Sequence, residues 1–138
     1  MRDERLRAVI ICPSNPFISV EPILAVPGTR EALSACAAPV IAVSPIIGGR
    51  AVKGPTAKMM GELGMTPSAA AVAKRYGDLL DGYVMDIGDA EEAAHVAPTV
   101  TLAPTLMTNL AEREQLARVV LEAADALATL KRGRDPVA

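Results

Sequence analysis

A short aliphatic segment near the start of the chain, residues 8–12, stops abruptly at a polar, proline-rich turn over residues 13–16. A run this short, rich in Val and Ile and closed by proline, is typical of a strand buried on both faces of a parallel sheet. Residues 39–43 repeat the pattern and are followed by Ser44-Pro45. Two such strands with a helical segment between them form a βαβ unit, so the sequence predicts parallel pairing.

Further segments alternate in the same way along the chain. Strands are expected at 82–85 and 99–103, and helices at 29–37, 56–63, 68–76 and 108–130. The alternation predicts an α/β fold in which a mostly parallel sheet of four strands carries flanking helices. The chain has 138 residues, 51% of them hydrophobic, and shows no linker or repeat, so one domain is expected over residues 1–138.

Composition argues against several classes of function. The net charge is −2 with both signs spread along the chain, so nucleic acid is not an expected partner. The apolar run after the charged start is too short for a signal peptide or a membrane helix, so we expect a cytoplasmic protein without a membrane partner. Cys12 and Cys36 lack CxxC spacing and the chain has one histidine, so we expect free, buried thiols and no zinc site.

The turn after the first strand is the first candidate binding site. Open α/β sheets bind ligands beyond the carboxyl ends of their strands. Ser14, Asn15 and Ser19 offer hydroxyl and amide groups to a phosphate or a nucleotide there. The alternative is a turn in which Ser14 and Asn15 only satisfy backbone groups, since Ser-Asn-Pro is also ordinary turn chemistry.

The stretch after the second strand, residues 46–55, is the second candidate. Gly48 and Gly49 allow backbone N–H groups to approach a ligand closely, and Lys53 adds positive charge. The functional interpretation is an anion-binding loop, and the alternative is a flexible connection with solvated basic residues. The Walker A spacing is absent. Asp86, at the end of the third strand, is interpreted as a helix cap rather than a ligand, and the sequence alone assigns no catalytic residue and no metal ligand.

Four blocks of residues occur in an order that resembles one known family. They are residues 12–16 (CPSNP), 23–28 (ILAVPG), 42–49 (AVSPIIGG) with 53–55 (KGP), and 76–82 (YGDLLDG). Together they are similar to the C-terminal half of 2-phospho-L-lactate transferases, over about residues 8–130. Four ordered blocks are far more specific than any one of them.

The resemblance implies a Rossmann-like fold, here as a partial domain, and a step in the biosynthesis of coenzyme F-420. Such enzymes transfer a phospholactyl group, or a phosphoenolpyruvyl group in some bacteria, from its guanosine diphosphate adduct. The acceptor is the deazaflavin alcohol 7,8-didemethyl-8-hydroxy-5-deazariboflavin; GMP leaves and Mg²⁺ assists. This chemistry needs charge neutralisation around a diphosphate and close positioning of the acceptor. Two loops are suited to parts of this charge neutralisation and positioning. One carries Ser14 and Asn15, and the other carries Gly48 and Lys53.

The sequence also departs from the family pattern. A full-length member is much longer, and its N-terminal half carries a glycine-rich strand–loop–helix and the aspartates used for metal and deazaflavin contacts. Neither is found in this sequence, so the Mg²⁺ ligands are expected outside it, and no catalytic residue is assigned. We therefore expect a fragment, a mis-started reading frame or half of a split enzyme, inactive alone, whose partner is an N-terminal half or another copy. The alternative is a non-catalytic α/β domain that binds a nucleotide or a partner subunit.

Overall fold

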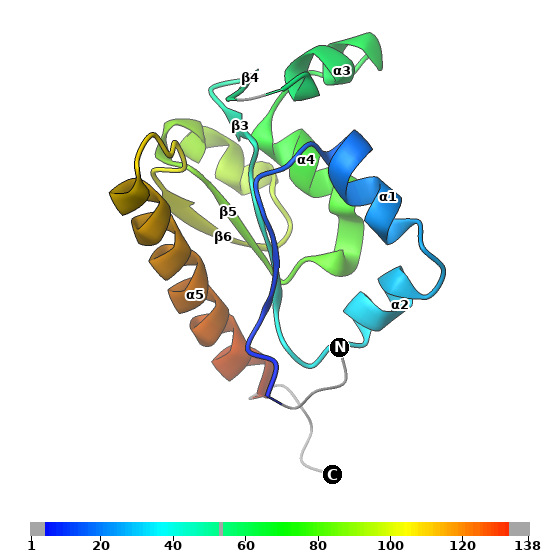
Figure 1. Ribbon diagram of the computed structural model, residues 1–138, viewed down its shortest axis with the longest axis vertical. Coiled ribbons are helices and arrows are strands. Elements are labelled where there is room, and N and C mark those ends of the chain that lie inside the picture. Colours follow the sequence, from blue (N-terminus) through cyan, green and yellow to red (C-terminus); the bar gives the residue numbers. More distant parts are fainter. Residues whose placement is uncertain (1–4, 53, 133–138) are drawn as a thin grey trace.

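The computed structural model describes residues 5–52 and 54–132, and its centre is a four-stranded sheet (Figure 1). The strands β1 (Val9–Ile11), β2 (Val40–Val43), β5 (Gly82–Asp86) and β6 (Thr99–Ala103) lie in the order β1-β2-β5-β6. All three pairings are parallel, with Val9 opposite Val40, Ile41 opposite Gly82, and Gly82 opposite Thr99. The predicted α/β fold with a parallel sheet and flanking helices is confirmed.

Helices pack on both faces of the sheet (Figure 1). The elements on one face are η1 (Pro16–Val20), α1 (Glu21–Leu24), α2 (Thr29–Ser34), α4 (Ala69–Tyr76) and η2 (Gly77–Leu79). The long helix α5 (Leu110–Arg132) covers the other face. Helix α3 (Thr56–Glu62) follows the two short strands described below, and η3 (Ile87–His95) connects β5 to β6.

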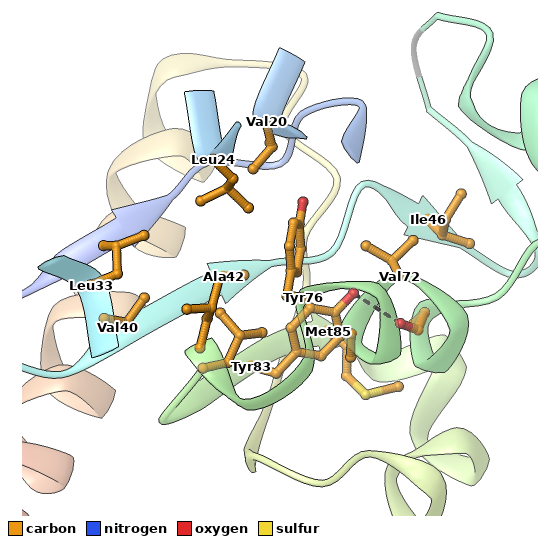
Figure 2. Packing of buried hydrophobic residues seen from close by; sticks show 14 of the residues in the cluster. Val20, Leu24, Leu33, Val40, Ala42, Ile46, Val72, Tyr76, Tyr83 and Met85 are labelled. Carbon is orange, nitrogen blue, oxygen red and sulfur yellow. Dashed lines mark hydrogen bonds between the residues drawn. The ribbon is translucent and has the colours of Figure 1, made fainter. Parts of the chain in front are cut away.

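Strand β2 shows how the sheet divides the core. Its four residues are all buried, as the sequence predicts. Because side chains alternate along a strand, Val40 and Ala42 pack beneath α1 and α4, whereas Ile41 and Val43 pack beneath α5. Figure 2 shows the first of these two clusters, in which the hydroxyl of Tyr83 donates to the Ala69 carbonyl at 3.0 Å.

Strand β1 does not have the burial that its sequence predicts. Residues 8–12 were expected to be buried on both faces, but Ile10 is 39% exposed and its neighbours Val9 and Ile11 are only partly buried. The reason is position, because β1 lies at the edge of the described sheet and pairs with β2 alone. Cys12, which follows, is exposed, so the expectation of two buried thiols is wrong for Cys12 and right for Cys36.

The glycine-rich stretch after β2 forms a short β-hairpin. Strands β3 (Ile46–Ile47) and β4 (Arg50–Ala51) pair antiparallel. The two residues between them, Gly48 and Gly49, have φ angles of +56° and +72°, which L side chains rarely adopt. Two consecutive residues with positive φ make the kind of two-residue turn that suits the twist of paired strands. Lys53 lies outside the described residues.

Among the residues that the structure describes, no helix is both long enough and apolar enough to cross a membrane.

Candidate functional site

At the carboxyl edge of the sheet, the segments that follow three of its strands meet around a cavity of about 270 Å³. The lining residues come from the turn after β1, the β3–β4 hairpin after β2, and the segment after β6 with the start of α5: Pro13, Asn15, Ser44, Pro45, Ile47, Val52, Thr105, Met107 and Arg113. Parallel strands end at the same edge of a sheet, and this edge is where open α/β sheets bind ligands. The two loops singled out from the sequence therefore lie on one rim.

The turn after β1 uses much of its polar chemistry on its own backbone. The side-chain oxygen of Asn15 accepts hydrogen bonds from the Phe17 and Ile18 N–H groups at 2.9 and 3.3 Å, which caps η1. Its Nδ2 donates a hydrogen bond to the sulfur of Met59 at 3.4 Å. Asn15 thus fills the alternative role of satisfying backbone groups, and the second N–H of its amide is the donor left to meet a ligand.

The two serines of this region lie in different settings. Ser14 is partly buried and sits between the lining residues Pro13 and Asn15. Ser19 is exposed within η1, and its backbone N–H donates to the Asn15 carbonyl at 3.1 Å. Ser14 is therefore the better placed of the two at the cavity rim.

The glycines of the second loop contact the protein more than the cavity. Gly48 donates its N–H to Oδ1 of Asp89 at 2.8 Å. A Cβ added to Gly49 would lie 3.5 Å from the backbone carbonyl oxygen of Pro67. The hydrogen bond to Asp89 holds the hairpin tip, and the flanking residues Ile47 and Val52 reach the cavity.

Three polar lining residues were missed from the sequence. Ser44 is buried, and its hydroxyl donates to the Ile46 carbonyl and accepts from the Ile46 N–H, both at 3.1 Å. Thr105 follows β6, and Arg113 lies in the first turn of α5 with no side-chain partner among the residues the structure describes. A signal was available for Ser44 and Thr105, since each comes directly after a predicted strand. Arg113 gave no such signal, because it is one charge among many on a long helix.

Asp86 connects the end of β5 to this lining. Its Oδ1 accepts from the Gly88 N–H at 2.9 Å, which caps η3 and confirms the interpretation of Asp86 as a cap. Its Oδ2 accepts from the backbone N–H and the hydroxyl of Thr105, at 2.8 and 3.1 Å. Burial alone would raise the pKa of the Asp86 carboxyl, but the hydrogen bonds from Thr105 and Gly88 hold it below its usual value. Asp86 is therefore a carboxylate that positions the segment after β6.

Among the described residues, no three His, Cys, Asp or Glu side chains come close enough together to share a metal ion. Both oxygens of Asp86, the carboxylate nearest the lining, are already occupied by hydrogen bonds. Arg113 instead brings a positive charge to the cavity, which suits an anionic group.

Comparison with known proteins adds an independent observation. A family model described as 2-phospho-L-lactate transferase CofD matches residues 4–124. A phosphoenolpyruvate transferase of Kitasatospora aureofaciens is 43% identical over 123 residues, which are 85% of this chain and 38% of that protein. The phosphoenolpyruvate transferase of Streptomyces coelicolor is 40% identical over 121 residues, again 85% and 38% of the two chains. A 2-phospho-L-lactate transferase of Methanosarcina mazei is 41% identical over 123 residues, or 87% and 40%. The chain thus spans 38–40% of the length of these curated relatives.

Proposed function

This chain belongs to the 2-phospho-L-lactate transferase CofD family, and we propose that it forms the C-terminal part of such a transferase. The complete enzyme would move a phospholactyl or phosphoenolpyruvyl group from its guanosine diphosphate adduct to 7,8-didemethyl-8-hydroxy-5-deazariboflavin. GMP would leave, and the product would enter coenzyme F-420 biosynthesis. Support comes from the matched residues 4–124 and from relatives of both kinds at 40–43% identity.

The observation that carries the proposal is the cavity at the carboxyl edge of the sheet. Its lining includes the side-chain amide of Asn15 and the guanidinium of Arg113, whereas the hydroxyls of Ser44 and Thr105 donate to the Ile46 carbonyl and to Asp86. Phosphate oxygens accept hydrogen bonds from amide and guanidinium N–H groups, and the bond from a guanidinium is charge-assisted. In this proposal the cavity holds the diphosphate of the guanosine adduct, which is the part of the substrate whose charge must be neutralised during transfer.

The residues proposed as nucleotide or phosphate contacts keep the assignments made from the sequence, with one addition. They are Ser14, Asn15, Ser19, Gly48, Gly49 and Lys53, to which the cavity adds Arg113. Asn15 contributes its NH₂ group, since its oxygen caps η1. For the two glycines, the role in the proposal is to shape the rim, because the Gly48 N–H is already bonded to Asp89.

The remaining parts of the reaction are assigned to residues outside this chain. Mg²⁺ and the deazaflavin acceptor would be held by an N-terminal part or by a second copy, in keeping with the share of the relatives that the chain spans. Mg²⁺ would supply charge neutralisation on the transferred phosphorus. The chain's own contribution is to bind and orient the diphosphate at the sheet edge. A cytoplasmic location stays a prediction from the sequence.

Titration with GDP tests the proposed site. GDP is expected to bind the chain weakly and to shift the backbone amide signals of the turn after β1 and of the start of α5 in NMR spectra. Arg113→Ala should raise the dissociation constant about tenfold, because a charge-assisted hydrogen bond to phosphate is lost. Arg118→Ala is the matched control, since Arg118 is exposed on the same helix and does not line the cavity. Equal effects of the two substitutions would mean that the cavity is not the phosphate site.

A second candidate is a non-catalytic domain that binds a nucleotide or a partner subunit through its open edge. The exposed Ile10 on β1 favours a partner on that side. Addition of the N-terminal part of a relative separates the two candidates. GMP release from the guanosine adduct, dependent on that part, on the deazaflavin and on Mg²⁺, supports the transferase. Binding of the added part without GMP release supports the second candidate.

A further inference from the structure

The 3₁₀ segment η3 and the residue before it carry three carboxylates that each hold a different neighbouring element. Asp86 accepts hydrogen bonds from Thr105, Asp89 accepts one from Gly48, and Glu92 accepts one from the N–H of Ala70 in α4. They are spaced three residues apart, and Asp89, with φ and ψ angles of −106° and 18°, lies at a kink within the segment. The middle carboxylate, Asp89, is the one that reaches the hairpin.

Asp89 is held in an environment that is unfavourable for a charge. The residue is only 6% exposed. Oδ1 receives the Gly48 N–H, whereas Oδ2 is buried without a hydrogen-bond partner among the described residues. Burial raises the pKa of the Asp89 carboxyl, whereas the hydrogen bond from the Gly48 N–H lowers it. The nearby charges of Glu92 and Asp86 also raise this pKa, so that it lies above its usual value. A carboxylate in this setting weakens the fold, so packing alone does not explain its presence.

We propose that Asp89 is a positioning residue for the cavity, because its hydrogen bond to Gly48 fixes the turn of the β3–β4 hairpin. That turn determines where the flanking residues Ile47 and Val52 meet the cavity. The effect on ligand binding rests on the function proposed above, whereas the hairpin contact itself does not.

The proposal separates Asp89 from residues that touch the ligand. Asp89 is absent from the described cavity lining and acts only through Gly48. An asparagine at this position can present its side-chain oxygen to the Gly48 N–H, so Asp89→Asn keeps the contact and removes the charge. Asp89→Ala removes the acceptor altogether. The two variants therefore distinguish a positioning hydrogen bond from a charge acting at a distance.

Two readouts on the 138-residue chain test this. The first is the exchange rate of the Gly48 amide proton by NMR, expected to rise about tenfold or more in Asp89→Ala and to stay near the parent value in Asp89→Asn. The second is the dissociation constant for GDP, expected to rise about tenfold in Asp89→Ala and to change little in Asp89→Asn. Glu91→Ala is the control, since Glu91 is exposed on the same segment, and neither readout should move.

Any other result contradicts a specific step of the proposal. An unchanged Gly48 amide in Asp89→Ala overturns the contact, and a released amide with unchanged GDP affinity overturns the positioning role. If the parent chain does not bind GDP, the proposed function fails, and the positioning role is judged by the methyl signals of Ile47 and Val52. Those signals should shift in Asp89→Ala, and unshifted signals overturn the role. If Asp89→Ala does not fold, Asp89→Ser, whose hydroxyl is too short to reach Gly48, replaces it in both measurements.

Discussion

Replacing Asp86 by asparagine is expected to weaken the fold and to loosen the cavity wall together. Asp86 is 8% exposed and accepts three hydrogen bonds, one from Gly88 and two from Thr105. Asparagine has one acceptor oxygen in place of two, so its NH₂ group must face either the Gly88 N–H or the two donors of Thr105. At least one donor is then left without a partner, and in the second case the two donors belong to the buried Thr105.

The magnitude follows from the number and burial of those donors. A buried donor that loses its partner costs about 1–3 kcal/mol, and hydrogen bonds to a charged acceptor are the stronger kind. Thr105 is 5% exposed, so water cannot readily replace the carboxylate. We expect Asp86→Asn to lower the free energy of unfolding by about 2–4 kcal/mol. Small domains have about 5–15 kcal/mol in total, so this is a large fraction.

The pH dependence of the unfolding free energy provides a second, independent test. The folded-state pKa of Asp86 lies below the unfolded value of 3.8. Its stabilisation is therefore fully present above 3.8 and is lost as the pH falls through the folded-state pKa. The difference in unfolding free energy between the parent chain and Asp86→Asn should be largest near pH 7 and shrink near pH 3.

Urea denaturation followed by far-UV circular dichroism measures this difference at both pH values. Asp78→Asn is the matched control, because Asp78 is exposed on η2 and accepts no side-chain hydrogen bond among the described residues. A loss below about 0.5 kcal/mol, within the range of ordinary surface substitutions, would refute the reasoning. An equal loss at both pH values would also refute it, because the carboxylate charge would then play no part.

Three further outcomes are expected. Gly82→Ala should lower the free energy of unfolding by about 1–3 kcal/mol, because the new Cβ would lie 2.6 Å from a methyl group of Leu127. The double variant with Leu127→Ala should lose less unfolding free energy than the sum of the two single variants. The chain alone should release no GMP from the guanosine adduct with deazaflavin and Mg²⁺; turnover that does not change when the N-terminal part of a relative is added would place the active site elsewhere. The parent chain should self-associate through the open edge of β1, and Ile10→Lys should reduce this in sedimentation; a parent chain that stays monomeric at every concentration contradicts it.

The parts of the fold that sequence predicts well are those decided by local signals. Helix α4 begins after Ser68, whose hydroxyl accepts the Ala71 N–H at 3.0 Å, and ends at Gly77, whose φ is +64°. Both residues mark helix ends for reasons that lie within one turn of the chain. The bounds of β6 agree with the expected 99–103 for the same reason, since proline and polar residues flank the run.

The burial of β1 was not predictable in this way. Residues 8–12 and 39–43 carry nearly the same aliphatic pattern, yet β2 is buried throughout and β1 is half exposed. Whether a strand lies in the middle or at the edge depends on which other strands pair with it, and that is decided by contacts far apart in sequence. The same limit applies to the Asp89–Gly48 bond, which joins residues 41 positions apart.

The candidate site shows why polar residues at strand ends are ambiguous in a sequence. A side-chain amide or a backbone N–H can bind a phosphate. The same groups also form the hydrogen bonds of turns and helix caps. Here the Asn15 oxygen and the Gly48 N–H are engaged within the protein, whereas the Arg113 guanidinium has no side-chain partner among the described residues. Arginine on an exposed helix turn has no local backbone role to compete with ligand binding. For that reason Arg113, which no motif marked, is the most direct test of whether the cavity binds an anion.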